Sequence, residues 1–115
     1  MYSVFFELLP RVRLAHQDGD TDSLLRIYGF AEWCFEQRAE DLWNAAGVAF
    51  YEHLFDSHRS LWPEFVLWMS PPVAEGCFGL WEARLSIEEM TVVRRLIAEC
   101  RNPVYQEARR TGGCA

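Results

Sequence analysis

The fold is decided by residues 24–55, which read LLRIYGFAEWCFEQRAEDLWNAAGVAFYEHLF. Two helical patterns meet there at the acidic joint Arg38-Ala39-Glu40-Asp41, and the second pattern is apolar nearly all the way round. A helix with so narrow a polar sector has to be covered by other helices on most of its sides. We therefore expect an all-α domain built around a buried central helix that runs from Asp41 to Phe55.

The first of the two patterns predicts a helix with one buried stripe. Its apolar residues recur at helical spacing: Leu24, Ile27, Tyr28, Ala31, Cys34 and Phe35. The side chains expected on the opposite face are polar: Arg26, Glu32, Glu36 and Gln37. Phe30 and Trp33 fall beside this polar face, so either a further helix covers them or they are presented to a partner.

The central helix is expected to place its large side chains on a broad buried arc: Trp43, Val48, Phe50, Tyr51, Leu54 and Phe55. Small residues between them keep its backbone slim enough for close packing. Only Ala45, Glu52 and Asp56 mark a solvent-facing edge.

The remaining segments also have helical spacing. Residues 4–15 predict a helix that Pro10 either kinks or divides into two short helices, since proline removes a backbone donor and crowds the preceding turn. Thr21 or Asp22 is expected to cap the helix that follows. A short helix begins near Leu61, with Pro63 in its first turn, and ends at Ser70.

The last third of the chain combines a weak and a strong signal. Residues 73–81 are either helix or loop, because each of the two glycines there weakens a helix by about 1 kcal/mol relative to alanine. Ser86 and Glu89 form a capping box, so a helix begins there. Its predicted buried stripe is Ile87, Met90, Val93, Ile97 and Cys100, Asn102-Pro103 ends it, and a short terminal helix through Tyr105 and Ala108 follows.

These elements predict a compact bundle of five to seven short helices in a single domain, residues 1–110, followed by a flexible tail, residues 111–115. The helical pair at residues 22–56 has the size of one repeat of a helical-hairpin solenoid, about 34 residues, which leaves repeat-like packing open although no second copy is recognisable.

The charge and composition exclude several classes of protein. The chain has 115 residues and a net charge of -6, and all eleven basic residues are arginine, so a duplex nucleic-acid binder, which needs a basic face, is not expected. No apolar run approaches the length of a membrane span, and the N-terminus lacks the basic region of a signal peptide, so we expect a cytoplasmic protein. The four cysteines form no C-x-x-C pair, and no metal or cofactor is expected.

Three candidate sites have weak patterns. Asp18, Asp20 and Asp22 alternate as in a calcium loop, but the rest of that motif is missing, so a helix-capping loop is favoured. His53, with Glu52, Asp56 and His58 nearby, is more typical of a hydrogen-bonded, partly buried histidine than of a catalytic or zinc site. Asn44 falls inside the apolar arc and is expected to fix a loop or helix end.

The strongest functional candidate is an acidic ridge beside exposed aromatic rings. Glu32, Glu36 and Glu40 are four residues apart, next to Phe30 and Trp33. Such a ridge is usually only a solvated face, but aromatic anchors with an acidic rim also suit recognition of an arginine- or lysine-rich protein.

The stretches Tyr28-Gly-Phe-Ala-Glu-Trp-Cys and Asp41–Phe55 resemble a family of small, uncharacterised bacterial all-helical proteins of unknown function. The resemblance implies an all-α cytosolic protein, and it carries no activity or catalytic residue onto this chain. Small size and acidity are also shared with immunity proteins that neutralise toxins, which is an analogy only.

Our first hypothesis is therefore a non-enzymatic interaction module, immunity-like or regulatory, that binds a basic protein surface. Its expected binding residues are Phe30, Glu32, Trp33, Glu36 and Glu40. One alternative is a small enzyme or ligand-binding bundle with a pocket lined by Trp43, Asn44, Tyr51 and His53. Another is a homodimer whose aromatic excess forms its own interface. Neither a nucleic acid nor a membrane is expected as a partner.

Overall fold

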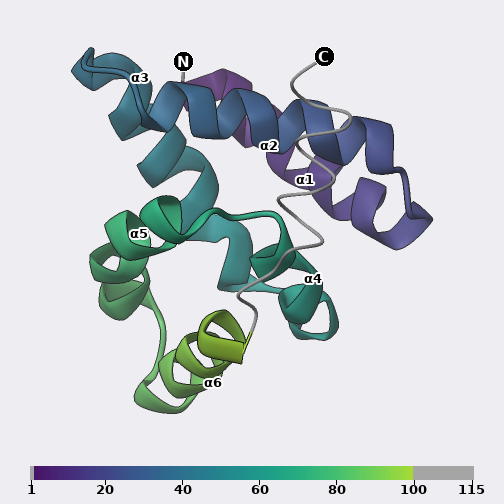
Figure 1. The fold of residues 1–115 in the computed structure, drawn as a ribbon, viewed down its shortest axis with the longest axis vertical. Coiled ribbons are helices and arrows are strands. Elements are labelled where there is room, and N and C mark those ends of the chain that lie inside the picture. The colour runs from purple at the N-terminus through teal and green to yellow at the C-terminus, as the bar shows by residue number, and fades with distance from the viewer. Residues whose placement is uncertain (1, 100–115) are drawn as a thin grey trace.

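The computed structural model describes residues 2–99, which form a series of helices joined by short turns (Figure 1). In chain order they are α1 (Tyr2–Asp18), α2 (Thr21–Phe35), α3 (Glu40–Ala45), the π-helix η1 (Ala46–Phe50), the 3₁₀ helices η2 (Tyr51–Asp56) and η3 (Arg59–Leu61), α4 (Trp62–Leu67), α5 (Pro71–Arg84) and α6 (Ile87–Glu99). No strand occurs within this described range, and the all-α fold of several short helices is confirmed.

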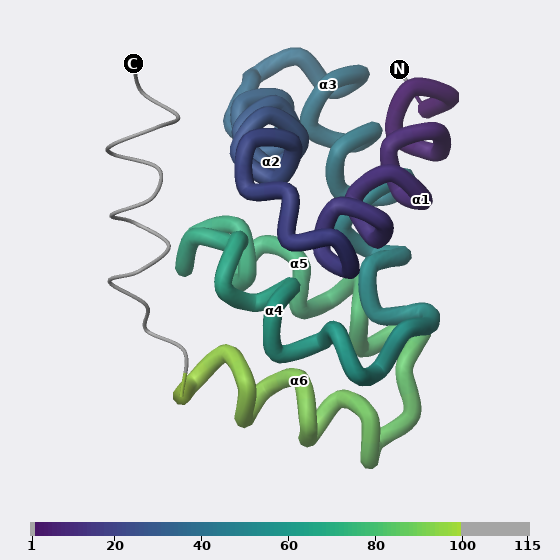
Figure 2. The backbone as a smooth tube through the Cα atoms, turned by 90° about the vertical axis from the view of Figure 1, so that its right-hand side faces the viewer, coloured from purple at the N-terminus to yellow at the C-terminus, as the bar shows by residue number. Residues whose placement is uncertain are grey.

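The helices lie in three tiers (Figure 2). In both views α1, α2 and α3 form one tier, α4 and α5 form the middle one, and α6 crosses the far side. The chain passes from the first tier to the second through η1, which packs against α1 and α2, and η2, which packs against α5. Residues 46–56 therefore occupy the centre of the molecule.

The large apolar side chains of this central segment are almost fully buried: Phe50, Tyr51, Leu54 and Phe55. The ring of Phe50 packs against Phe5 of α1 and Tyr28 of α2. The ring of Phe55 contacts Trp81 of α5, whose indole Nε1 donates a 2.8 Å hydrogen bond to the carbonyl oxygen of Tyr51. The expected burial of the central segment is confirmed for these four residues.

The central segment is not the single regular helix that its spacing predicts. It is α-helical up to Ala45, π-helical from Ala46 to Phe50 and 3₁₀ from Tyr51 to Asp56. A π-helix turns less per residue than an α-helix, so the faces before and after it do not align as on an α-helical wheel. Two expectations are wrong as a result. Trp43, expected on the buried arc, is 40% exposed, and Ala45, expected at the solvent-facing edge, is fully buried.

The first two helices differ from the predictions in detail. α1 continues through Pro10 as one helix, so the alternative of two short helices is wrong. Pro10 lies on the exposed side of α1, away from the buried stripe that holds the helix to its neighbours. α2 is capped by Asp20 rather than by Thr21 or Asp22, because an oxygen of Asp20 accepts a hydrogen bond from the backbone N–H of Ser23 at 3.2 Å.

The later helices follow the sequence signals more closely. Pro63 lies in the first turn of α4, and α5 is helical throughout despite its two glycines. The capping box of α6 is present: the N–H of Ser86 donates to Glu89 Oε1 at 2.9 Å, and the N–H of Glu89 donates to Ser86 Oγ at 3.1 Å.

The predicted stripe of α6 is only partly correct. Met90 and Val93 are buried and Ile97 is partly buried, but Ile87 is 90% exposed. Ile87 is the first residue of α6, where the chain has just left α5, and the bundle does not extend over it. The predictions for Cys100, for residues 102–108 and for the tail at 111–115 lie outside the described residues.

Candidate functional site

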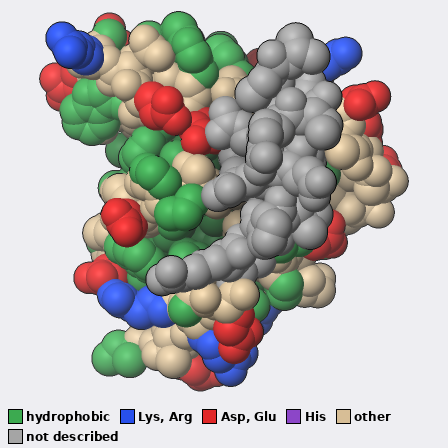
Figure 3. Space-filling view, viewed as in Figure 1, with side chains coloured by type: hydrophobic (Ala, Val, Ile, Leu, Met, Phe, Trp, Pro, Cys, Tyr) green, Lys and Arg blue, Asp and Glu red, His purple; other side chains and the backbone are tan. Residues whose placement is uncertain are grey.

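The expected aromatic and acidic side chains lie at the end of the molecule where α2 leads into α3. Figure 3 shows hydrophobic and acidic side chains beside one another over this end. We call Phe30, Trp33, Glu36 and Glu40 the α2–α3 surface. Because Phe30, Trp33 and Glu36 are three residues apart, their side chains are neighbours on the helix.

Trp33 is the more exposed of the two aromatic side chains on this surface. Its side chain is 56% exposed on the face of α2 opposite the buried stripe, and the amide of Gln37 donates to its backbone carbonyl at 2.9 Å. Phe30 is 37% exposed and stacks on Phe5 of α1, with the ring centroids 5.5 Å apart. Phe30 is thus anchored to the bundle, and Trp33 projects from it.

The carboxylates of the predicted ridge do not all reach this surface. Glu36, at the C-cap of α2, and Glu40, at the start of α3, are exposed, as is the adjacent Asp41. Glu32 is only 5% exposed, so the prediction that it faces solvent is wrong. The buried part of α2 is wider than its apolar stripe, and it includes the flank that carries Glu32. The surface nevertheless keeps an acidic character, opposed locally by the exposed Arg38.

The four residues of the alternative pocket have separate contacts in the structure. Trp43 is exposed, and Asn44 donates from its amide to the hydroxyl of Tyr2 on α1. Tyr51 is buried against the ring of Phe50. None of the four lines the groove between α1 and α2 or the groove beside α6. Asn44 was expected to fix a loop or helix end, and its amide instead links α3 to a side chain of α1.

His53 belongs to a charged network that ties three helices. Its Nδ1 lies 2.6 Å from Asp56 Oδ2, and Asp56 accepts two hydrogen bonds from Arg84 of α5, at 3.0 and 2.8 Å. Arg13 of α1 donates to the carbonyl oxygen of His53 at 2.8 Å. Partial burial raises the pKa of Asp56, but the hydrogen bonds from Arg84 and His53 outweigh it and leave that pKa below its usual value. The network acts as a crosslink between α1, η2 and α5.

The other residues near His53 have separate roles. Glu52 lies 3.7 Å from His53 Nε2 and 3.9 Å from Arg84, at the edge of the network. His58 does not join it, since its Nδ1 contacts the hydroxyl of Ser57 at 2.7 Å. Within residues 2–99, no group of three or more His, Cys, Asp or Glu side chains is arranged to hold a metal ion.

Of the alternating aspartates Asp18, Asp20 and Asp22, Asp20 is the one that caps α2. Both oxygens of Asp20 accept hydrogen bonds from Ser23, one from the backbone N–H at 3.2 Å and one from the hydroxyl at 2.7 Å. These bonds lower the pKa of Asp20.

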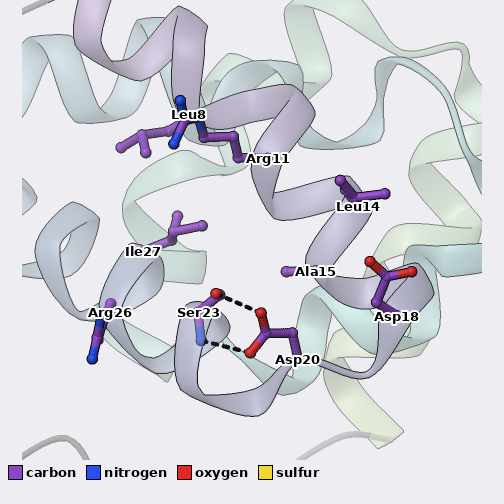
Figure 4. A pocket seen from close by; sticks show the side chains of 9 residues that line it. All are labelled: Leu8, Arg11, Leu14, Ala15, Asp18, Asp20, Ser23, Arg26 and Ile27. Atoms are coloured by element: carbon purple, nitrogen blue, oxygen red, sulfur yellow. Dashed lines mark hydrogen bonds between the residues drawn. The ribbon is translucent and has the colours of Figure 1, made fainter.

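The same loop closes one end of a groove between α1 and α2 (Figure 4). The groove has a volume of about 310 Å³ and is open to solvent along one side. Leu8 and Ile27 face each other across it, with Arg11 and Arg26 at its edges. This groove was not predicted from the sequence, because its lining comes from two helix flanks and neither flank has a motif of its own.

A buried polar contact at His16 was also not predicted from the sequence. Its Nε2 lies 2.8 Å from the hydroxyl of Tyr28, and its Nδ1 lies 3.4 Å from Glu64 of α4. Burial lowers the pKa of His16, and the contact with Glu64 opposes that shift. The burial of His16 could have been predicted, because His16 continues the α-helical spacing of Phe5 and Val12 on the buried side of α1.

The cysteines within the described residues are buried thiols. Cys34 of α2 and Cys77 of α5 are free and fully buried. Burial raises the pKa of both, that of Cys77 to about 12. A thiol with so high a pKa is a poor nucleophile and metal ligand.

Comparison with known proteins gives one match. The family described as Domain of unknown function (DUF7674) matches residues 1–86, which comprise α1 to α5 and the capping residue of α6. No curated protein and no solved structure matches the chain. Within residues 2–99, no helix is both long and apolar enough to span a lipid bilayer.

Proposed function

We propose that this chain, which belongs to the family described as Domain of unknown function (DUF7674), is a non-enzymatic binding module that recognises a basic protein through its α2–α3 surface. The observation that carries the proposal is Trp33, a large aromatic side chain that is 56% exposed and bordered by carboxylates. Its role is immunity-like or regulatory, and its location is the cytoplasm, where Cys34 and Cys77 stay reduced.

The chemistry of the surface agrees with this role. Tryptophan is enriched among the residues that contribute most to protein interfaces, because one ring buries a large area with few rotatable bonds. A rim of carboxylates favours a basic partner and increases its rate of association, as does the net charge of -6. Phe30, held by its stack on Phe5, provides a rigid apolar contact beside Trp33.

The test is affinity capture by the full-length chain from a native lysate, with Trp33→Ala compared with Leu14→Ala. Leu14 of α1 is also 56% exposed, lies outside the α2–α3 surface, and so controls for the loss of an exposed apolar side chain. We expect a basic protein to be captured by the wild type and by Leu14→Ala, but not by Trp33→Ala. Circular dichroism and thermal unfolding check that both variants stay folded.

The partner is then purified and its affinity measured as a function of salt. Charge reversal by Glu36→Arg with Glu40→Arg should weaken binding about tenfold or more at low salt, and less at high salt. A partner that binds Trp33→Ala as tightly as the wild type would contradict the proposal. Sedimentation at several concentrations tests the alternative that the chain forms a homodimer. If the wild type is a dimer and Trp33→Ala is a monomer, the partner is a second copy of this chain.

A further inference from the structure

Arg94 of α6 is held by an aromatic ring and a carboxylate that lie side by side on α5. Its guanidinium carbon is 5.2 Å from the ring centroid of Phe78, and its Nη2 is hydrogen-bonded to Glu82. Phe78 and Glu82 are four residues apart, so they are neighbours on the helix surface. A single helix can thus present a ring and a charge that together bind one arginine.

Arg59 makes a similar pair of contacts elsewhere. Its guanidinium carbon lies 5.4 Å from the ring centroid of Trp62, and its Nη2 lies 3.7 Å from Glu88. The face of an aromatic ring attracts a cation through its quadrupole, and a carboxylate adds the opposite charge. Both arginines are still about half exposed, so this arrangement works at a solvated surface of the molecule.

α2 presents an equivalent ring and carboxylate. Trp33 and Glu36 are three residues apart and both are exposed, and Phe30 extends the aromatic surface on the other side of Trp33. Among the described residues, no guanidinium lies over Trp33 and no ion pair involves Glu36. Within residues 2–99, the pair at α5 therefore holds an arginine of the bundle, whereas the pair at α2 holds none.

We propose that the Trp33–Glu36 pair binds an arginine side chain of the partner protein. This inference rests on the proposed function and specifies which residue of a basic partner contacts this surface. The planar guanidinium can stack on the indole ring and hydrogen-bond to the Glu36 carboxylate at the same time. The ammonium of lysine is a compact, strongly hydrated charge that fits this arrangement less well.

The experiment uses the full-length protein with tryptophan labelled by ¹⁵N, and follows the indole N–H signal of Trp33, which is assigned with Trp33→Phe. The probes are three acetylated and amidated tripeptides made of arginine, of lysine or of citrulline, the uncharged analogue of arginine. We expect the arginine tripeptide to shift the Trp33 signal with an affinity about 2–5 times higher than the lysine tripeptide, as an exposed cation–π contact implies. The citrulline tripeptide should leave the signal unshifted.

Glu36→Gln should weaken binding of the arginine tripeptide by a similar factor of about 2–5. Asp22→Asn is the matched control, since it removes the same charge from the exposed first turn of the same helix, and it should leave the affinity unchanged. Equal binding of the arginine and lysine tripeptides, or no shift of Trp33 with either, would overturn the arginine site. If capture of the partner still depends on Trp33 in that case, the proposed function stands without the arginine; if capture is also independent of Trp33, both are wrong.

Discussion

The Nε2 atom of His16 lies 2.8 Å from the hydroxyl of Tyr28, and both side chains are buried where α1 meets α2. An imidazole in such a place serves as a hydrogen-bonding group of the core, but it also remains titratable. Burial lowers the pKa of His16 from its ordinary 6.5, and Glu64 only partly opposes this. The folded protein therefore prefers the neutral imidazole.

This preference predicts that the protein loses stability as the pH falls through the mildly acidic range. Below about pH 6.5 the unfolded chain binds a proton that the folded chain resists, so the free energy of unfolding should fall by up to about 1.4 kcal/mol per pH unit. Three carboxylates have lowered pKa values and therefore also stabilise the folded protein: Asp20, Asp56 and Glu89. Their contributions to the free energy of unfolding are lost only at more acidic pH. Urea unfolding between pH 5 and pH 8 measures the effect.

Two variants isolate the role of His16. His16→Phe should be destabilised by about 1–3 kcal/mol at pH 7.5, because it removes a buried hydrogen bond, and it should lose most of the pH dependence between pH 5 and pH 6.5. His58→Asn removes an exposed histidine whose positive φ of 59° asparagine tolerates, so it should keep that dependence. An unchanged slope in His16→Phe would show that another group is responsible.

The two glycines of α5 should respond to alanine in opposite directions. A Cβ at Gly79 would meet no heavy atom within 4 Å, so Gly79→Ala should stabilise the protein by about 0.5–1 kcal/mol through its higher helix propensity. A Cβ at Gly76 would lie 2.8 Å from Cζ of Phe35, and that ring also packs against Tyr51. Gly76→Ala should therefore destabilise by about 1 kcal/mol or more. Chemical unfolding of both variants gives the comparison, and a stabilised Gly76→Ala would mean that Phe35 moves aside easily.

The contact of Arg94 with Phe78 and Glu82 should be measurable but weak. Because Arg94 and Glu82 are both about half exposed, solvent screens their attraction, and a double-mutant cycle with Arg94→Ala and Glu82→Ala should give a coupling of about 0.3–1 kcal/mol. Added salt at 0.5 M should reduce it. A coupling of zero at low salt would show that the contact between Arg94 and Glu82 contributes nothing to stability. It would also weaken the argument that Trp33 and Glu36 bind an arginine in the same way.

The buried cysteines should react only after unfolding. Cys34 and Cys77 are enclosed in the core, and the pKa of Cys77 is raised to about 12, so almost no thiolate forms at neutral pH. With an aromatic disulfide reagent at pH 8, these two thiols should be protected in the native protein and exposed in guanidinium chloride. Mass spectrometry of the labelled peptides distinguishes them from the other cysteines. Fast native labelling of Cys77 would indicate that α5 opens readily.

The features predicted correctly from sequence depend on neighbours along the chain. The capping box of Ser86 and Glu89 involves residues three apart, and the buried stripe around Tyr28 follows from α-helical spacing alone. The errors arise where tertiary packing decides. Glu32 is buried because its flank of α2 is covered, and Ile87 is exposed because nothing lies over the start of α6.

The largest error concerns the winding of the central segment. An α-helical wheel places Trp43 with Phe50 and puts Ala45 on the solvent side, but the π-helical turn between them changes the relation. No single residue of this stretch marks the change, since alanine, glycine and valine all occur in ordinary α-helices, although glycine and valine are weaker helix formers than alanine. The position of Trp33 off the buried stripe of α2, by contrast, could be predicted, because that helix is regular. Whether a further helix covers Trp33 could not be predicted, and the structure shows that it is exposed.

The π-helical stretch from Ala46 to Phe50 also limits how the number of residues in the middle of this chain can change. A π turn holds one residue more than an α turn, so deleting one residue there would convert the stretch to α-helical winding and leave Leu54 and Phe55 directed into the interior. Inserting one residue would instead turn every later side chain of the segment by about 100°. Leu54 and Phe55 would then leave the interior, and Asp56 would lose its partner on α5. Relatives that share this architecture should therefore show one-residue deletions in this stretch more often than insertions.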